Sequence, residues 1–158
     1  MVTAPVFISH RGNIDGVNPA RENSPDYIDE CIASGYDCEI DLRIKDGVPH
    51  LGHDTPDHPI SAVWIYKRMD RLWIHVKEYD ALVWLMDYCP NATYFCHEGD
   101  RYTLVSNGSI WSHDLSNRMT DMCVIPLLSK DAVWSHDKSG FGAVCSDFIH
   151  DCVERWGN

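Results

Sequence analysis

The sequence predicts an α/β protein with a largely parallel sheet covered by helices. Short β-prone runs alternate along the chain with amphipathic helical segments, the pattern in which helices connect parallel strands. Of the 158 residues, 44% are apolar and 23% are charged, as in a soluble globular chain with a core. Several predicted strands also end in polar residues. At this length we expect one domain over residues 1–158.

The first predicted elements are a strand, a helix and a second strand. Residues 6–9 form a short apolar run typical of a buried strand. Ser24 is a suitable N-cap, Pro25 suits the first helical position, and Gly35 suits the helix end. In residues 38–45 apolar and polar side chains alternate, which predicts a strand with one polar and one apolar side.

The rest of the chain continues the alternation. Asp46-Gly47 predicts a hairpin turn, and a loop with two prolines comes after it. The remaining predicted elements are a strand at 71–77, a helix from 78 ended by Pro90, four short strands (ATYFCHEGD, GSIWSHD, MCVIPLL and FGAVCSDF) and a closing helix at 149–158.

Charge and composition exclude several classes of partner. The net charge is −11, whereas nucleic acids and anionic lipids select clustered Lys and Arg, so we expect neither. Residues 1–5 lack the features of a signal peptide, and no segment approaches the ~20 apolar residues of a membrane span. We therefore expect no stable membrane association and a cytoplasmic location. The seven cysteines include no C-x-x-C pair, which predicts reduced, mostly buried thiols.

Polar side chains at the strand ends are the first indication of a site. The carboxyl ends of parallel strands meet at one rim, where ligands and catalytic groups collect. Glu39 and Asp41 are separated by one residue, so they share a face with ~6.6 Å of rise between them. Two such carboxylates repel each other unless a cation lies between them, and hard oxygen ligands suit Mg²⁺ or Ca²⁺. The alternative is a pair of solvated acids on an exposed strand edge.

Two histidines and two cations extend this candidate site. His10 closes the first strand and His53 closes the hairpin, and two imidazoles can share acid and base roles. Arg11 and Lys77 supply the positive charge that phosphate oxygens require. Glu22 could add a metal ligand or support one; its alternative role is routine helix capping.

Together these motifs resemble the glycerophosphodiester phosphodiesterase family and its relatives among phosphatidylinositol-specific phospholipase C-like and sphingomyelinase D-like barrels. The resemblance is carried by SHRG at 9–12, EN at 22–23, EIDLRIKDGVPHLGHD at 39–54 and HVK at 75–77. It is strong over the first 54 residues. After residue 77 it thins to the strand VCSDF, which is similar to the closing T-D strand of the family.

The resemblance implies a TIM-type barrel with a divalent cation that hydrolyses or cyclises phosphodiesters. Because a complete barrel takes about 250 residues, 158 residues predict a compact or truncated (β/α) barrel with short or missing helices. Carried over residue by residue, it implies that His10 and His53 are the acid/base pair and that Arg11 binds the phosphate. Glu39 and Asp41 would be metal ligands. Lys77 would stabilise developing charge, and Glu22 would be an acid at or behind the metal.

Two features depart from the pattern of the family. The third strand usually carries an acid where this sequence has His75, which predicts weaker metal affinity, a softer metal such as Mn²⁺, or a dormant site. One of His97, Glu98 and Asp100 could replace the lost carboxylate, or these residues form a plain polar loop. The insertion that usually follows the H-D element is also reduced to a short loop. We expect His113 and His136 to lie outside the site.

The sequence therefore predicts a metal-dependent phosphodiester hydrolase or cyclising lyase that acts on a glycerophosphodiester-like or a sugar or polyol phosphodiester. One of His10 and His53 would activate a hydroxyl or water, and the other would protonate the leaving alkoxide; the sequence does not assign these two roles. The alternative is a binding module that recognises a phosphorylated polyol or sugar without turnover. The oligomeric state is left open.

Overall fold

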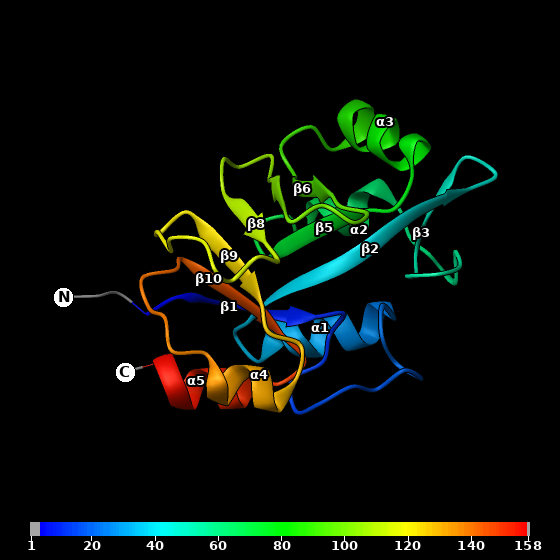
Figure 1. Cartoon of the computed structure of the whole chain (residues 1–158). Coiled ribbons are helices and arrows are strands. Elements are labelled where there is room, and N and C mark those ends of the chain that lie inside the picture. The colour runs from blue at the N-terminus through cyan, green and yellow to red at the C-terminus, as the bar shows by residue number, and fades with distance from the viewer. Residues whose placement is uncertain (1–3, 158) are drawn as a thin grey trace.

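A computed structural model describes residues 4–157, whose ten strands share one curled sheet (Figure 1). The strands are β1 Val6–His10, β2 Asp37–Lys45, β3 Val48–Leu51, β4 His58–Pro59, β5 Leu72–Val76, β6 Thr93–Cys96, β7 Tyr102–Leu104, β8 Ile110–Ser112, β9 Cys123–Pro126 and β10 Ala143–Ser146. The helices are α1 Pro25–Ala33, α2 Ala62–Tyr66, α3 Tyr79–Tyr88, α4 Lys130–Ser135 and α5 Ile149–Trp156.

Parallel pairing dominates the sheet. The parallel run has the order β6-β5-β2-β1-β10-β9-β8 within the described residues. β3 pairs with β2 in an antiparallel hairpin, and Asp46 and Gly47 adopt positive φ values of 52° and 76° at its turn. The predicted α/β class, the parallel sheet and this hairpin are therefore confirmed.

β2 carries the predicted division between an apolar and a polar side. Cys38, Ile40 and Leu42 are fully buried and belong to the apolar cluster that also includes residues of α1 and α3. Glu39 and Asp41 are only 2% and 0% exposed. The alternative of solvated acids on an exposed edge is therefore wrong, because the polar side of β2 faces the inside of the curled sheet.

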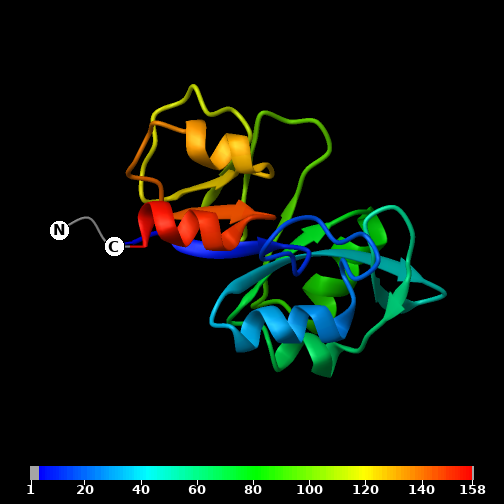
Figure 2. The same cartoon turned by 90° about the horizontal axis from the view of Figure 1, so that it is seen from below.

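The helices lie outside the curled sheet, and a separate apolar cluster lies inside it. Figure 2 shows α4 and α5 on the flank of β1 and β10, with α1 and α3 beside β2. The inner cluster takes side chains from most of the strands and is made of Ile8, Trp73, Phe95, Val105, Trp111, Val124, Ala143 and Cys145. This cluster fills the curl beneath the polar rim.

The two ends of the curled sheet meet at a seam between β6 and β7. β7 is antiparallel to β8, and residues 103–106 hydrogen bond to residues of and next to β6. The Ser106 amide donates to the Tyr94 carbonyl at 2.8 Å, and the Thr103 hydroxyl donates to the Cys96 carbonyl at 2.9 Å. One backbone hydrogen bond and a few side-chain hydrogen bonds therefore stand where a continuous ladder would close a barrel.

Short helices account for the small size of the fold. α2 and α4 span five and six residues, and the described residues between β6 and β9 contain no helix. The sequence pattern predicted neither α2, α4, β4 nor β7. At the start of α1, Ser24 occupies the N-cap position, but its side chain makes no capping hydrogen bond. Short or missing helices were predicted from the chain length, and this prediction is confirmed.

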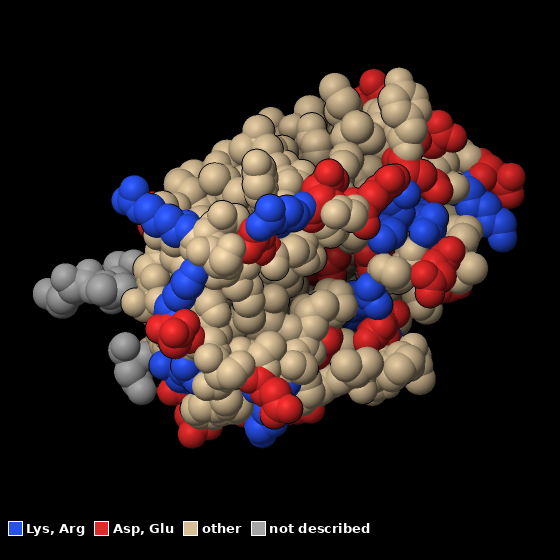
Figure 3. All heavy atoms as spheres, viewed as in Figure 1, with Lys and Arg blue, Asp and Glu red and all other residues tan. Residues whose placement is uncertain are grey.

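The buried thiols follow the expectation from composition, and the charges on the visible face are mixed. On the face shown in Figure 3, Lys and Arg atoms are interspersed with Asp and Glu atoms and do not gather in one basic patch. The seven cysteines are free, and all but Cys96 are buried. Within the described part of the chain, every helix falls short of the length and apolarity that crossing a membrane requires.

Candidate active site

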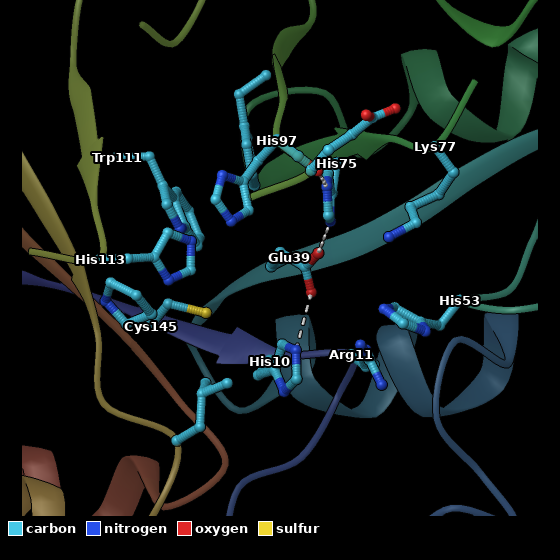
Figure 4. A pocket seen from close by; sticks show the side chains of 14 residues that line it. His10, Arg11, Glu39, His53, His75, Lys77, His97, Trp111, His113 and Cys145 are labelled. Carbon is cyan, nitrogen blue, oxygen red and sulfur yellow. Dashed lines mark hydrogen bonds and ion pairs between the residues drawn. The ribbon is translucent and has the colours of Figure 1, made fainter. Parts of the chain in front are cut away.

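The rim at the carboxyl ends of the strands surrounds a pocket of about 270 Å³ (Figure 4). Six of the predicted site residues line it, namely His10, Arg11, Glu39, His53, His75 and Lys77. Its other lining residues are Phe95, His97, Glu98, Trp111, His113, Pro126, Leu128 and Cys145. Glu22 and Asp41 are not part of the lining, although both contact residues that are.

Strand register brings the central residues together. His10 is the register partner of Glu39 between β1 and β2, and Asp41 is the register partner of His75 between β2 and β5. Alternation along β2 then points both acids to the inner face. The site is therefore a direct product of the pairing of three neighbouring parallel strands.

Glu39, Asp41 and His75 form a compact cluster of candidate metal ligands. One ligand atom from each residue lies within 4.8 Å of the others. His75 Nδ1 is 3.1 Å from Asp41 Oδ1 and 3.8 Å from Glu39 Oε1. The other ring nitrogen, Nε2, donates to the His97 carbonyl at 2.9 Å.

Unpartnered oxygens show that this cluster fits a cation. Glu39 Oε2 and Asp41 Oδ1 are buried and have no hydrogen-bond partner among the described residues. Buried polar atoms are rarely left so, because desolvation without a compensating bond is costly. Two carboxylate oxygens and one imidazole nitrogen form a reasonable donor set for a divalent ion. The residues present therefore fit the metal that the resemblance implies.

The two carboxylates differ in their titration. Burial, reinforced by the charge of Asp41, raises the pKa of Glu39 to about 7. Burial also acts to raise the pKa of Asp41, but the contact with His75 Nδ1, 3.1 Å from Oδ1, and the charge of Arg11 outweigh it and hold that pKa well below its usual range. One acid of the pair is thus firmly ionised, and the other exchanges its proton near neutrality.

Asn23 and Arg11 hold Asp41 in place. The Asn23 side chain donates to Asp41 Oδ2 at 2.9 Å and accepts the Asp41 backbone N–H at 2.9 Å. Arg11 Nε forms an ion pair with the same Oδ2 at 3.0 Å. The other oxygen, Asp41 Oδ1, faces His75, and Lys77 Nζ lies 3.8 Å from this oxygen. This arrangement orients one oxygen of Asp41 into the cluster.

His10 is oriented by an acid from the far end of the chain. Its Nδ1–H donates to Asp147 Oδ1 at 2.8 Å, and the same oxygen accepts from Asn13 at 2.7 Å. His10 Nε2 then points toward Glu39, 3.9 Å from its Oε2 (Figure 4). Burial lowers the pKa of His10, but the hydrogen bond to Asp147 and the charge of Glu39 outweigh it, so the pKa is raised.

His53 reaches the pocket from the loop after β3. Its Nδ1 is 2.7 Å from Asp54 Oδ1, and its backbone carbonyl accepts two bonds from the Arg43 guanidinium at 3.0 and 2.5 Å. The side chain is 38% exposed, more than the other polar groups that surround the Glu39–Asp41–His75 cluster. His53 is thus held at its backbone, and its ring stands at the open side of the pocket.

Glu22 lies outside the metal cluster. Its carboxylate pairs with Arg11 at 3.3 Å and accepts from Asn13 at 2.8 Å. Because Asn13 also binds Asp147, Glu22 belongs to a network that connects the supports of Arg11 and His10. The structure therefore places Glu22 behind Arg11, and its proposed role becomes to orient the guanidinium.

The inner wall of the pocket is aromatic and apolar. His113, which we expected to lie outside the site, lines this wall and stacks on His97 at 4.0 Å; that expectation was wrong. Burial, together with the neighbouring charge of His97, lowers the pKa of His113 to about 4. The ring is therefore neutral at ordinary pH. Trp111 completes the wall with Phe95, on which it stacks at 4.2 Å.

The remaining polar candidates, Glu98, Asp100 and His136, differ in their position relative to the pocket. Glu98 lines the pocket, whereas Asp100 does not. His136 packs against Phe141 and Trp156 in the cluster beneath α4 and α5, as expected of a residue outside the site. Neither Glu98 nor Asp100 belongs to the Glu39–Asp41–His75 cluster, so no third carboxylate is gathered there within the described residues.

The sequence assigned no role to two supporting residues, Asn13 and Asp147. Asp147 directly follows β10, which pairs with β1, and the sequence indicated it only as one of the polar strand ends that we expected to meet at the rim. Asn13 follows SHRG in a turn and carried no signal of its own. Both residues act by fixing the ring of His10 or the carboxylate of Glu22.

Comparison with known proteins supports this assignment of the fold. No protein-family model and no curated protein matches the sequence. The chain is similar in structure to a proposed glycerophosphodiester phosphodiesterase from Galdieria sulphuraria, with a TM-score of 0.51, 15% identity and 99% coverage of both chains. It is also similar to a glycerophosphoryl diester phosphodiesterase from Parabacteroides distasonis, with a TM-score of 0.57, 12% identity, and coverage of 97% of this chain and 86% of that one.

A third similar structure is a proposed glycerophosphoryl diester phosphodiesterase from Silicibacter pomeroyi, with a TM-score of 0.53, 10% identity, and coverage of 98% and 93%. At 10–15% identity these likenesses concern the fold. The resemblance that the motifs predicted is thus confirmed as a structural one over nearly the whole chain. The chain has the fold of the glycerophosphodiester phosphodiesterase structures, in a curled, mostly parallel form with few helices.

Proposed function

We propose that the protein is a metal-dependent phosphodiesterase that hydrolyses or cyclises a small phosphodiester, such as a glycerophosphodiester or a sugar or polyol phosphodiester. One observation carries the proposal: His10, His53, Arg11 and Lys77 converge on a single pocket at the edge of the Glu39–Asp41–His75 cluster. Imidazoles, cations and a candidate metal centre are the parts that phosphoryl transfer uses.

Positive charge at the pocket suits a phosphate group. The whole chain carries a net charge of −11, yet Arg11 and Lys77 both line this pocket with side chains no more than 18% exposed. Partly buried cations interact more strongly with phosphoryl oxygens than solvated ones do. These two residues would bind the substrate phosphate and stabilise the charge that grows on its oxygens.

The two imidazoles are placed to move protons. In His10 and in His53, Nδ1 is engaged by a neighbouring carboxylate, so Nε2 is the free atom. In hydrolysis, a water oxygen would bond to phosphorus while one imidazole takes its proton. As the bond from phosphorus to the leaving alcohol breaks, the other imidazole would give that oxygen a proton. In cyclisation, a hydroxyl of the substrate replaces the water.

A divalent cation held by Glu39, Asp41 and His75 would supply electrostatic stabilisation of the phosphoryl oxygens. Asn23 and Arg11 hold Asp41 ready for that role. The apolar wall of Trp111 and His113 would contact the group esterified to the phosphate and exclude water from it. The cytoplasm remains the compartment predicted from the sequence.

The test is an assay with bis(p-nitrophenyl) phosphate and with glycerophosphodiesters, in the presence of Mg²⁺, Mn²⁺ or Ca²⁺ and after chelation. We expect metal-dependent turnover that falls by about 10²–10⁴-fold in His10→Ala and in His53→Ala. His150→Ala changes an imidazole on α5 that pairs with Asp15 outside the pocket, and it serves as the matched control with unchanged rate.

The result that would overturn the enzyme proposal is equally concrete. A chain that binds glycerol phosphate or a polyol phosphate in calorimetry, but turns over no diester with any of these metals, is the binding module considered above. The His75 position is the observation that favours this alternative, because an imidazole replaces an acid there. Cyclic and open products are distinguished by phosphorus NMR of the reaction mixture.

A further inference from the structure

We propose that the Glu39–Asp41–His75 cluster selects a first-row transition-metal ion of the Mn²⁺, Co²⁺ and Zn²⁺ class over Mg²⁺ and Ca²⁺. The inference rests on the proposed function and deepens it, because it names the class of metal that this same site binds. The determinant is the imidazole nitrogen of His75, whose orientation is fixed by its surroundings.

The hydrogen bond from His75 to the His97 carbonyl decides which nitrogen is available. A carbonyl oxygen only accepts, so His75 Nε2, 2.9 Å away, must carry a hydrogen. In the neutral ring, Nδ1 is therefore the atom with the free lone pair. A backbone carbonyl on the remote ring nitrogen is also the usual outer support of a metal-binding histidine, because it fixes the tautomer and the ring orientation.

Stacked rings prevent His75 from turning away. The His75 ring lies 5.0 Å from the Phe95 ring with an interplanar angle of 7°, and Phe95 in turn stacks on Trp111 at 4.2 Å. The His75 side chain is only 13% exposed. The stacked Phe95 ring, backed by Trp111, and the hydrogen bond to the His97 carbonyl thus hold Nδ1 of His75 toward the two acids, as Figure 4 shows for His75 and Glu39.

The facing atoms require a positive charge between them. His75 Nδ1 lies 3.1 Å from Asp41 Oδ1 and 3.8 Å from Glu39 Oε1. A lone pair at that distance from carboxylate oxygens is repelled, so either a proton on Nδ1 or a cation shared by the three groups must be present. Such a cation would contact Glu39 Oε1 and would satisfy Asp41 Oδ1, which has no hydrogen-bond partner among the described residues.

The nitrogen donor disfavours both Ca²⁺ and Mg²⁺, and the small number of protein oxygens further disfavours Ca²⁺. Ca²⁺ takes 6–8 oxygen ligands, and Mg²⁺ prefers an octahedral shell of oxygens. Asp41 Oδ2 is engaged by Asn23 and Arg11, so Asp41 offers a single oxygen. Imidazole nitrogen suits transition-series ions such as Co²⁺ and Zn²⁺ better than the hard cations Mg²⁺ and Ca²⁺, and Mn²⁺ stands at the weak end of the transition series. One nitrogen and few carboxylate oxygens therefore define a site for the softer class.

Binding is measured directly on the full-length, metal-free protein, without reference to turnover. Co²⁺ is titrated by its visible absorption, Mn²⁺ by the loss of its free EPR signal, and Mg²⁺ and Ca²⁺ by competition against Mn²⁺. We expect Co²⁺ to bind on the order of 100-fold more tightly than Mg²⁺. Pulsed EPR of the Mn²⁺ complex should show coupling to one directly bound imidazole ¹⁴N.

Two variants identify the nitrogen. In His75→Asp the ¹⁴N coupling should disappear, and the preference for Co²⁺ over Mg²⁺ should fall at least about tenfold, because an oxygen replaces the nitrogen. His97→Ala is the matched control: it removes a neighbouring imidazole 6.2 Å away but keeps the carbonyl that holds His75. In this control the coupling and the metal preference should persist. Circular dichroism confirms that each variant is folded.

The outcomes separate this inference from the proposed function. Equal affinity for Mg²⁺ and Co²⁺, absence of the ¹⁴N coupling, its survival in His75→Asp, or binding of no divalent ion would each overturn the metal inference. Selective Co²⁺ and Mn²⁺ binding with no diester turnover would leave the inference standing and reject the enzyme proposal. Diester turnover by a site that does not discriminate between the metals would support the enzyme proposal and reject the metal inference.

Discussion

His10 shows how a single residue depends on a distant part of the chain. Its ring is held by Asp147, 137 positions away, and Asp147 is itself held by Asn13. The contact leaves Nε2 free to face the pocket and raises the pKa of His10 against the effect of burial. Asp147 therefore acts through His10, as a residue that positions the imidazole.

Asp147→Asn tests this role. The amide can still accept the hydrogen bond, but it carries no charge to stabilise the imidazolium. We expect kcat to fall by about 10²-fold or more and the pKa of His10 to move down, which shifts the matching limb of the pH–rate profile to lower pH. NMR titration of the His10 ring checks the shift. Asp137→Asn, on an exposed loop, is the control, and an unmoved profile in Asp147→Asn would reject the role.

Some site residues could be predicted at this scale, and others could not. Glu39 and Asp41 carry their own signal, because a spacing of two on a strand places them on one face. Asp147 is a single acid at a strand end, and its contact with His10 exists only after β10 pairs with β1. His113 reaches the pocket by stacking on His97 from another strand end, and no local spacing encodes that distance.

At the scale of elements, the loop after β3 shows how backbone geometry places a catalytic candidate. Gly52 has a φ of +154°, and a Cβ there would lie 1.9 Å from the Thr55 carbonyl oxygen. The next residue is His53, whose carbonyl is held by Arg43. The close approach that glycine permits therefore determines where the His53 ring stands.

Gly52→Ala should displace this loop while leaving the sheet folded. We expect turnover to fall by about tenfold or more, since a shift of about 1 Å at a reacting group has costs of that order. The melting temperature should change less than in a core substitution. Gly47→Ala is the matched control, because no atom lies within 4 Å of the Cβ it adds. Its positive φ affects only the hairpin turn. Equal rates in both variants would contradict the prediction.

Long elements were predictable, and short ones were not. β2 and α1 have nine residues each, which is enough for an alternating or a helical pattern to be visible. α2, α4 and β7 span only three to six residues, so their patterns cannot be told from loops. α2 and α4 are preceded by the N-cap residues Ser61 and Ser129, whose side chains do cap the helix, and these serines were the available signals.

At the scale of the whole molecule, a buried acid couples stability to pH. The pKa of Glu39 is raised from 4.5 to about 7, so the folded chain binds this proton more tightly than the unfolded chain does. The stabilisation is complete below about pH 4.5 and is lost as the pH rises through about 7. His10, whose pKa is also raised, acts in the same direction above its ordinary value of 6.5.

Compared with Glu39→Gln, which lacks the titrating group, the metal-free wild type should therefore lose melting temperature between pH 5 and pH 8. The comparison is needed because the lowered pKa of His113 acts in the opposite direction below about pH 6.5, and it does so in both proteins. Added divalent metal should stabilise the wild type more at pH 8 than at pH 5, because ligation needs the ionised carboxylate. Calorimetry with and without chelator measures these effects. A wild type whose melting temperature does not fall relative to that of Glu39→Gln over this range would contradict the assignment.

The overall curl was predictable, but the way it closes was not. Chain length and the order of elements indicate a reduced parallel barrel, whereas the seam between β6 and β7 depends on the side chains of Thr103 and Ser106. These are ordinary polar residues in the sequence. Their partners are backbone groups in β6 and in the residues next to it. These groups come close to Thr103 and Ser106 only after the parallel run of seven strands has paired.

The alternation along β2 has an evolutionary consequence. Odd positions from 37 to 41 supply the acids, and even positions supply the contacts beneath the helices. A single-residue insertion or deletion inside this strand would exchange the two sets, placing carboxylates among hydrocarbon and hydrocarbon at the pocket. Length changes should therefore be tolerated at the Asp46-Gly47 turn and purged between 38 and 42.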